Sequence, residues 1–367
     1  MTRFWLGGYG PTMDGSAEGI GVLAGDSGRE ATTLAYRGPV TQTSSPSWIE
    51  PHPTLDVVYA ALEDDAAVQA FARTGETALT PLGGPVATGD GVCHVAVSPD
   101  GGTLIASCYG DGRVVRYGIA ADGRLVPAKE DAAAALRAAL FGESDPEAPA
   151  PTPPGDGVAA TDPHGGPDRA SHAHSAVFLT DGRLASTDLG YDLVRFWRLG
   201  GSGLVLDQEV VLPQGTGPRH MVMHPSGHLH VVTELSCEVF TLAQAADGTW
   251  AVVSSTVASP IAQAGADFPA ELARTRDGQF LYTALRGSNT VAALRVRGSG
   301  EALEPVALAD SGVDWPRHHL VHEGKLLVAG QRSDTVTLLD LDERTGAPLG
   351  VRHEAQAPAP TRILHIR

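Results

Sequence analysis

Three arginines stand in short motifs that are typical of an anion-binding site. Arg219 lies in GTGPRHMVMHP, Arg286 in ALRGSNTV and Arg317 in WPRHHL. A guanidinium group keeps its charge near neutral pH and offers parallel N–H donors to a carboxylate or a phosphate. Alternatively, each arginine pairs with a nearby acid such as Glu234 or Glu271 and only ties parts of the fold together. In a chain whose net charge is −17, three arginines at one place favour a site for an anionic ligand.

Two histidines in SHAHSA could supply a general base. His172 and His174 are two residues apart, so on a β-strand they would share one face. A neutral imidazole that faces a channel can accept a proton from water. The same spacing could bind a metal ion if further ligands came from His94, His164, His220 or Glu234. We predict a site without metal, and a metal-dependent hydrolase is the alternative.

The composition excludes several classes of protein. The chain has 367 residues with 26 Lys and Arg against 43 Asp and Glu, which argues against nucleic acid and anionic membranes as partners. The 3 cysteines are widely spaced and indicate neither a disulfide framework nor a cysteine-based zinc site. The first residues lack the apolar core of a signal peptide, and no run approaches the roughly 18 apolar residues of a membrane span. We therefore expect a cytoplasmic protein that needs no cofactor.

An internal repeat predicts the elements that position these side chains. A short turn, often Asp-Gly, precedes an apolar strand, a polar loop and a second alternating strand. The turns lie at positions 56, 100, 181, 227, 277 and 323, which gives spacings of 44, 81, 46, 50 and 46 residues. A four-stranded propeller blade takes roughly 40–50 residues, and the long spacing fits one blade with an insertion. Helical periodicity is almost absent, while period-2 alternation is common.

The two ends of the chain supply a seventh blade. Arg3–Gly8, Gly19–Leu23 and Ala31–Arg37 are expected as three of its strands, and Thr361–Ile366 as the innermost one. Pairing of the ends closes the ring and removes a free sheet edge. We therefore predict one all-β domain over residues 1–367, a seven-bladed β-propeller, in preference to a pair of β-sandwiches.

An insertion at about residues 129–169 interrupts the repeat. It contains DAAAALRAALF, which is expected to form a short helix, and the Pro-rich stretch PEAPAPTPPGDG. The insertion is either a surface loop that partly covers a site or a segment without a function, and both hypotheses stay open.

The positions within the blades predict that the candidate residues meet at one mouth of the central channel. In each blade, the start of the innermost strand and the loop between the second and third strands lie at that mouth. The candidates at these positions are His172, His174, Arg219, His220, Arg317, Glu234, Arg286 and Gln331. Propeller blades pack through apolar strands, and charge that is buried without a partner is costly. The clustering therefore indicates a ligand site.

Several motifs, in this order, resemble the seven-bladed propeller lactonases. They are SHAHSA, TDLGYD, GTGPRHMVMHP, VTELS, ALRGSNTV, WPRHHL and AGQRSDTV. That family includes the propeller type of bacterial 6-phosphogluconolactonase and the fungal carboxy-cis,cis-muconate cyclase. The resemblance covers most of the chain outside the insertion, and GTGPRHMVMHP followed by TEL is its most specific part. The ALRG of this chain departs from the SNRG common in the family but keeps the arginine.

The resemblance implies a catalytic cluster at the channel mouth. By motif, the catalytic residues are expected to be His174, Glu234, Arg219 and Arg286. The residues expected to bind substrate are His172, His220, Arg317 and Gln331. We expect His174, assisted by Glu234, to act as general base and Arg219 to stabilise an oxyanion. Because SHAHSA holds two histidines, His172 is an alternative base.

The expected activity is hydrolysis of a sugar-acid-type lactone, with a small anionic substrate such as 6-phosphogluconolactone held by the arginines. The same residues would suit a cycloisomerase of the carboxy-muconate type. A different class, a non-enzymatic propeller that binds a protein or a sugar acid, also stays open. The sequence decides neither the lactone nor the oligomeric state.

Overall fold

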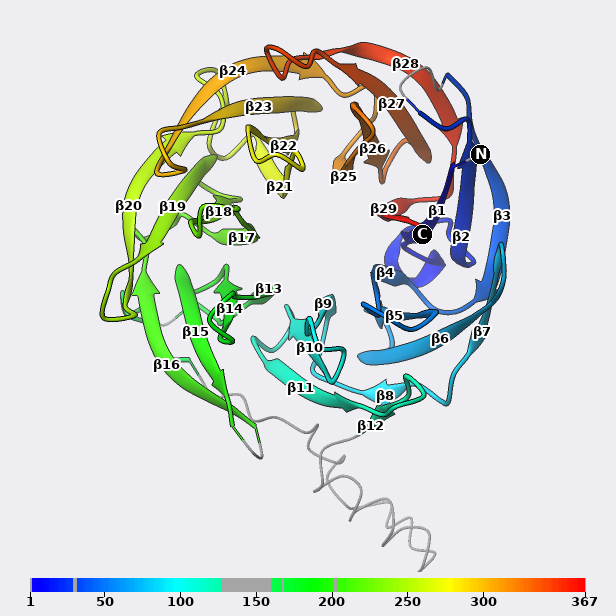
Figure 1. The fold of residues 1–367 in the computed structure, drawn as a ribbon, viewed down its shortest axis with the longest axis horizontal. Helices are drawn as coiled ribbons and strands as arrows, with labels where there is room; N and C mark the ends of the chain where they lie inside the picture. The colour runs from blue at the N-terminus through cyan, green and yellow to red at the C-terminus, as the bar shows by residue number, and fades with distance from the viewer. Residues whose placement is uncertain (1, 29–31, 127–159, 167, 201–202, 367) are drawn as a thin grey trace, which may run out of the picture.

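Short alternating strands form seven antiparallel sheets that surround a central opening (Figure 1). The computed structural model describes residues 2–28, 32–126, 160–166, 168–200 and 203–366. Across these ranges the regular elements are 29 strands and one 3-10 turn, η1 (Pro11–Met13). The prediction of an all-β, seven-bladed propeller is confirmed.

The first blade joins the two ends of the chain. From the channel outward its strands are β29 (Pro360–His365), β1 (Thr2–Gly8), β2 (Gly19–Gly25) and β3 (Leu34–Gln42). Leu6 of β1 pairs with Ile363 of β29, as the predicted closure requires. The outer strand lies further along the chain than the predicted Ala31–Arg37 and runs through Pro39. An edge strand tolerates proline because its outward-facing groups need no ladder partner.

The other six blades follow in sequence order around the ring. The second and third contain β4 (Pro46–Pro51), β5 (Val57–Leu62), β6 (Ala67–Gly75), β7 (Ala78–Pro81), β8 (Val86–Ala87), β9 (Val92–Val97), β10 (Thr103–Cys108), β11 (Val114–Ile119) and β12 (Leu125–Val126). The fourth and fifth contain β13 (Ala173–Phe178), β14 (Leu184–Asp188), β15 (Leu193–Leu199), β16 (Leu204–Val211), β17 (Pro218–Met223), β18 (Leu229–Thr233), β19 (Glu238–Gln244) and β20 (Trp250–Val257). The sixth and seventh contain β21 (Phe268–Arg274), β22 (Phe280–Arg286), β23 (Thr290–Arg297), β24 (Ala302–Asp310), β25 (Pro316–His322), β26 (Lys325–Gly330), β27 (Thr335–Leu341) and β28 (Pro348–Gln356).

Most of the predicted insertion, including its expected helix, lies outside the described residues. The part that is described anchors to the fourth blade. Arg169 lies 2.7 Å from Asp162 and also pairs with the buried Asp192, in the loop between β14 and β15. The end of the insertion is therefore fixed beside the innermost strand β13.

Adjacent blades pack face to face, so their second and third strands are buried on both sides. All six residues of β5 are buried. Between the second and third blades, Tyr59 and Tyr117 pack with Leu104. The Tyr59 hydroxyl donates to the Gly123 carbonyl at 2.9 Å, and the Tyr117 hydroxyl donates to the Ala87 carbonyl at 2.6 Å. Such strands form nearly continuous apolar runs because neither face meets water, and each tyrosine finds an acceptor for its one polar atom.

Every innermost strand carries a register shift close to its first residue, in all seven blades. In β17, Pro218 pairs with Thr233 but His220 pairs with Val232, so Arg219 is an additional residue in the strand. Proline is the first residue of β4, β17, β25 and β29 and the second residue of β21, and it cannot donate a ladder hydrogen bond. A β-bulge of this kind bends the strand and re-aims its side chains.

The bulge turns the side chains of two consecutive residues of each innermost strand toward the channel. In an unbroken strand these two side chains would point to opposite faces of the sheet. We call these two sets the upper layer and the lower layer. The upper layer is Ser47, Cys93, His174, Arg219, Ala270, Arg317 and Thr361. The lower layer is Trp48, His94, Ser175, His220, Glu271, His318 and Arg362. Each blade therefore contributes one side chain to each of two levels in the channel.

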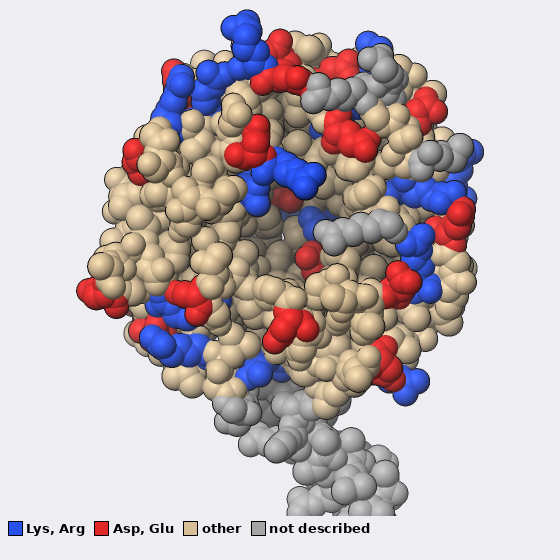
Figure 2. All heavy atoms as spheres, viewed as in Figure 1, with Lys and Arg blue, Asp and Glu red and all other residues tan. Residues whose placement is uncertain are grey.

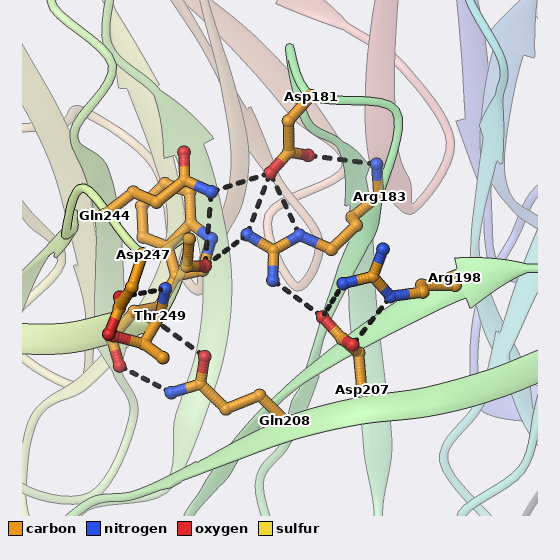
Figure 3. A network of polar contacts seen from close by, with 10 residues as sticks. Asp181, Arg183, Arg198, Asp207, Gln208, Gln244, Asp247 and Thr249 are labelled. Atoms are coloured by element: carbon orange, nitrogen blue, oxygen red, sulfur yellow. Dashed lines mark hydrogen bonds and ion pairs between the residues drawn. The ribbon is translucent and has the colours of Figure 1, made fainter.

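A polar network joins the fourth and fifth blades at their outer edge (Figure 3). Arg183, directly before β14, lies 2.8 Å from Asp181 and 2.8 Å from Asp207, and it donates to the Gly248 carbonyl of the next blade at 2.7 Å. Arg198 lies 2.7 Å from the same Asp207. The side chain of Arg198 is 66% exposed, whereas that of Arg183 is 9% exposed. The Arg183 contacts are therefore expected to contribute more to stability.

Replacing Arg183 with Met is expected to lower the free energy of unfolding by about 1–3 kcal/mol, because partly exposed acceptors in two blades lose a buried donor that joins them. Arg198→Met is the control, and its loss is expected to stay within about 0.5 kcal/mol because that ion pair is exposed. Chemical denaturation followed by tryptophan fluorescence measures both. Equal losses in the two variants would contradict a structural role for Arg183.

Candidate functional site

Charged and aromatic side chains from the upper layer and from nearby loops meet at one mouth of the channel. We call this group the upper cup: Tyr9, Glu63, Tyr109, His174, Arg219, Glu234, Arg286, Arg317 and Gln331. Three of them belong to the upper layer, and the others end a second strand or directly follow one. The expected meeting of innermost-strand starts and second-strand loops is thus observed for these residues.

Glu234 holds two guanidinium groups together. Its Oε2 atom lies 2.8 Å from Arg219 Nε and 2.6 Å from Arg286 Nη2. These contacts are close ion pairs, because neither nitrogen is aligned for a hydrogen bond. Arg219 also donates to the Ala270 carbonyl, and Arg286 donates to the Phe268 carbonyl. Although burial opposes ionisation, Arg286 and Arg219 lower the pKa of Glu234, so this side chain is a carboxylate at neutral pH.

Arg317 reaches the same cup from the seventh blade, and its direct partners are uncharged. It donates to the Tyr9 hydroxyl at 2.5 Å and to Gln331 Oε1 at 3.2 Å. The Tyr9 hydroxyl in turn donates to Glu63 at 3.1 Å. The guanidinium group also lies 4.8 Å from the centre of the Tyr9 ring. Arg317 therefore contacts a carboxylate only through Tyr9, and Gln331 lies beside Arg317 at the channel mouth.

Positive charge exceeds negative charge in the upper cup. Three guanidinium groups, Arg219, Arg286 and Arg317, are accompanied by two carboxylates, Glu63 and Glu234. Burial and then repulsion by Arg219 lower the pKa of Arg286 to about 9. The alternative in which the arginines pair with nearby acids holds in part, because Arg219 and Arg286 both pair with Glu234 whereas the direct partners of Arg317 are uncharged. Guanidinium groups in such an arrangement are stabilised by an anion.

His174 is a buried, neutral imidazole at the wall of the cup. Burial, followed by the charges of Arg219 and Arg317, holds its pKa well below the ordinary value. Its Nδ1 atom has no hydrogen-bond partner within the described residues, and its ring meets Tyr109 edge-on at 6.0 Å. In the described part of the chain no contact joins His174 to Glu234. The expected assistance by Glu234 is therefore not a direct hydrogen bond.

His172 lies just outside β13, which begins at Ala173. The spacing argument from one continuous strand does not apply to His172 and His174, because β13 begins at Ala173 and the bulge at His174 breaks the alternation. Both rings nevertheless contact the same side chain. The His172 ring stacks on Tyr109 with centres 4.4 Å apart and planes inclined by 14°.

His220 lies in the lower layer, although Arg219 beside it belongs to the upper cup. Its Nδ1 atom accepts the Leu272 N–H at 3.3 Å, and its ring lies 5.5 Å from the Trp48 ring. The bulge therefore separates His220 from the other residues that were expected to bind substrate. Sequence adjacency had suggested that the two neighbours face the same ligand.

Sequence reasoning missed an aromatic platform at the rim of the cup. Trp315, directly before β25, has a φ of +58°, which is rare for a bulky residue, and its N–H donates to Asn289 Oδ1 at 3.0 Å. The guanidinium group of Arg332 lies 3.6 Å from the Trp315 ring centre, and that of Arg286 lies 5.4 Å from it. The exposed Arg332 thus adds positive charge beside Arg286. The motifs WPR and QRS contained these residues, but only the tertiary fold brings them together.

The arrangement can move a proton and stabilise developing negative charge. A neutral imidazole can act as a general base, and guanidinium groups supply donors for an oxyanion. Among the described residues, no group of three or more His, Cys, Asp or Glu side chains is placed to hold a metal ion. In the same part of the chain, no helix has the length and apolar character needed to span a membrane.

Known proteins share this architecture over its full length. A family model described as "Lactonase, 7-bladed beta-propeller" matches residues 3–365. The protein YwcC of Lactococcus lactis, which is uncharacterized, is 28% identical over 375 residues, with 99% of each chain covered. The 6-phosphogluconolactonase of Bacillus subtilis is 25% identical over 377 residues, covering 100% of this chain and 99% of that protein. Among solved structures, the periplasmic gluconolactonase PpgL of Pseudomonas aeruginosa matches with a TM-score of 0.84 at 22% identity, over 100% of this chain and 99% of that one.

Removing the charge of Arg317 is expected to raise the pKa of His174 toward its ordinary value, because the guanidinium group disfavours a protonated imidazole. NMR titration of the histidine Cε1–H signals in Arg317→Gln measures this pKa, and His174→Gln assigns the signal. Arg124→Gln is the control, since that side chain is 60% exposed beside β12. A His174 titration that is unchanged in Arg317→Gln would contradict the electrostatics described for the cup.

Proposed function

Because the chain belongs to the family of seven-bladed β-propeller lactonases, we propose that it hydrolyses a sugar-acid-type lactone that carries a negative charge. The observation that carries the proposal is the excess positive charge of the upper cup, where Arg219 and Arg286 share Glu234. An anionic substrate offsets the repulsion among the guanidinium groups. The name of the Bacillus subtilis relative, 6-phosphogluconolactonase, supports a phosphorylated sugar lactone as the candidate substrate.

In the proposed reaction, neutral His174 accepts a proton from water while the water oxygen attacks the lactone carbonyl carbon. The π electrons of the carbonyl move to its oxygen, and Arg219 stabilises that oxyanion. When the tetrahedral intermediate collapses, the bond to the ring oxygen breaks, and this oxygen takes the proton from His174. One water is consumed, and the product is the open hydroxy acid.

His174 has a low pKa in the absence of substrate. We propose that binding of an anionic substrate raises this pKa and so makes His174 an effective base. Burial and the charges of Arg219 and Arg317 keep the pKa of His174 well below its ordinary value. A substrate anion beside these guanidinium groups reduces their effect and raises this pKa toward the working pH, where a general base is most efficient. Substrate charge and proton transfer are thereby coupled.

Glu234 is proposed to act as a positioning residue. It contacts Arg219 and Arg286 through Oε2, and it keeps both guanidinium groups at the same side of the cup. Arg286 and Arg317 then bind the phosphate or carboxylate of the substrate while Arg219 faces its carbonyl. With Glu234 assigned to positioning and the arginines to binding, His174 is the only proposed base.

Arg219→Ala is expected to lower kcat on an accepted lactone by about 100- to 1000-fold, because the oxyanion loses its donor. The fold is expected to survive, since Arg286 and Glu234 remain as a neutral pair 2.6 Å apart. A pH-stat assay of phosphorylated and plain aldonolactones and of muconolactones, corrected for spontaneous opening, measures the rate. Circular dichroism checks the fold, and Arg124→Gln serves as the control. Unchanged turnover in Arg219→Ala would remove this residue from the oxyanion role.

The isotope content of the product separates the proposed reaction from its alternatives. In H₂¹⁸O, hydrolysis places one solvent oxygen in the new carboxylate. An isomer of unchanged mass would instead identify a cycloisomerase. If the folded protein turned over none of these lactones, the proposed hydrolase would be wrong, and a binding propeller would be favoured.

Arg332→Gln is expected to raise KM for a phosphorylated lactone about tenfold with little change in kcat, because a rim guanidinium binds the phosphate equally in the ground state and in the transition state. KM for the unphosphorylated lactone is expected to stay the same. Steady-state kinetics on both substrates measure this difference. An equal effect on the two lactones would show that Arg332 does not contact the phosphate.

A further inference from the structure

Below the upper cup, aromatic side chains of the lower layer close the channel. The Trp48 ring centre lies 4.4 Å from that of His94, 5.5 Å from that of His220 and 5.6 Å from that of His318. The His94 and His220 rings are 5.8 Å apart. These four side chains come from four different blades, so their contacts span the channel. The channel is therefore divided into the upper cup and a second compartment.

The second compartment, which we call the lower chamber, is a cavity of about 430 Å³. Pockets that hold small molecules have volumes of about 300–1,000 Å³. The polar residues of the chamber are Trp48, Glu50, His94, His220, Glu271 and Arg362. Its walls are apolar and come from β9, β13, β17 and β21, with Val97, Phe178, Val222 and Leu272 among them. Figure 2 shows that one face of the ring is hollowed at its centre, with acidic and basic side chains in and around the hollow.

The charge balance of the lower chamber is the reverse of that in the upper cup. Here one guanidinium group serves two carboxylates. Arg362 Nη2 lies 3.2 Å from Glu50 Oε2, and Arg362 Nη1 lies 3.6 Å from Glu271 Oε1. The same guanidinium group lies 3.8 Å from the centre of the Trp48 ring. The chamber therefore holds two carboxyl groups for one cation, and burial raises the pKa of Glu50 although Arg362 opposes this effect.

The imidazoles of the lower layer do not supply the missing positive charge. His318 Nδ1 accepts the Ile363 N–H at 3.3 Å, and its Nε2 atom lies between Arg362 Nη1 at 2.5 Å and Glu271 at 2.8 Å. Burial lowers the pKa of His318 and of His220 well below the ordinary value, and it lowers that of His94 to about 3. All three rings are neutral near pH 7.

Polar atoms of the chamber also lack partners within the described residues. His94 is 6% exposed, and its Nδ1 atom has no hydrogen-bond partner. The indole Nε1 atom of Trp48 likewise has no hydrogen-bond partner. Buried polar groups are normally hydrogen-bonded, so these atoms indicate that water or a ligand completes the chamber.

We propose that the lower chamber binds a small organic cation, whose ammonium group lies against Glu50 and Glu271 and whose apolar part lies along the chamber wall. The cation supplies the positive charge that Arg362 alone does not, and its N–H groups are charge-assisted donors to the carboxylates. Repulsion by the excess carboxylate opposes an anion, and a neutral ligand leaves the imbalance in place. The proposal concerns a site other than the upper cup and does not rest on the proposed function.

The test compares three probes of similar shape that differ in charge: phenethylammonium, 2-phenylethanol and 3-phenylpropanoate. The observable is the indole N–H signal of Trp48 in ¹⁵N NMR spectra of the full chain, which Trp48→Phe assigns among the 5 tryptophans. We expect saturable shifts with phenethylammonium below about 10 mM and at least about tenfold weaker binding of the other two probes. Equal binding of the alcohol, or no saturable shift with the ammonium ion, would overturn the proposal.

Two variants locate the binding site. Glu50→Gln leaves Arg362 paired with Glu271 and is expected to fold, and it should weaken phenethylammonium binding at least about tenfold. Ala176→Leu is expected to fill part of the chamber and to block the probe without any change of charge. Glu76→Gln is the matched control, because that side chain is 76% exposed on the outer surface. Binding that is unaffected by both Glu50→Gln and Ala176→Leu would place the probe elsewhere and overturn the proposal.

Discussion

The β-bulge at the start of each innermost strand is the constraint on which the channel depends. In an unbroken strand, neighbouring side chains point to opposite faces of the sheet, and only one residue of each pair would reach the channel. The bulge brings both, so Arg219 enters the upper cup while His220 enters the layer below. Because the shift recurs in all seven blades, the channel has two levels of different chemistry.

The two levels keep opposite charge excesses apart within one channel. In the cup, two arginines share Glu234, and in the chamber, two glutamates share Arg362. Direct pairing of the extra arginine with the extra glutamate would neutralise both. In the lower layer the rings of Trp48 and His94 pack together with centres 4.4 Å apart. Charges that cannot reach each other remain available to ligands of the opposite sign.

The repeat spacing was sufficient to predict the blades, because regularly spaced turns and alternating strands are local properties of the chain. The convergence of Arg219, Glu234 and Arg286 could also be predicted from their equivalent places in successive blades. It could not be predicted that His220 lies in the lower layer, because the position of a bulge depends on how the strand pairs with the next one. The same holds for Trp315, whose left-handed backbone is stabilised by a distant asparagine. Tertiary hydrogen bonds decide these features, and residue order alone does not encode them.

The position of β29 determines when the ring can close during synthesis of the chain. β29 is translated after all the other described strands, yet it lies innermost in the blade that begins with β1. Until it emerges, the nascent chain can stack blades but holds an open arc with unpaired backbone at β1. Arg362 also arrives with β29, so Glu50 and Glu271 lack this counterion until the last strand is made. Completion of the toroid and the pairing of Arg362 with both glutamates therefore occur together, as the last step.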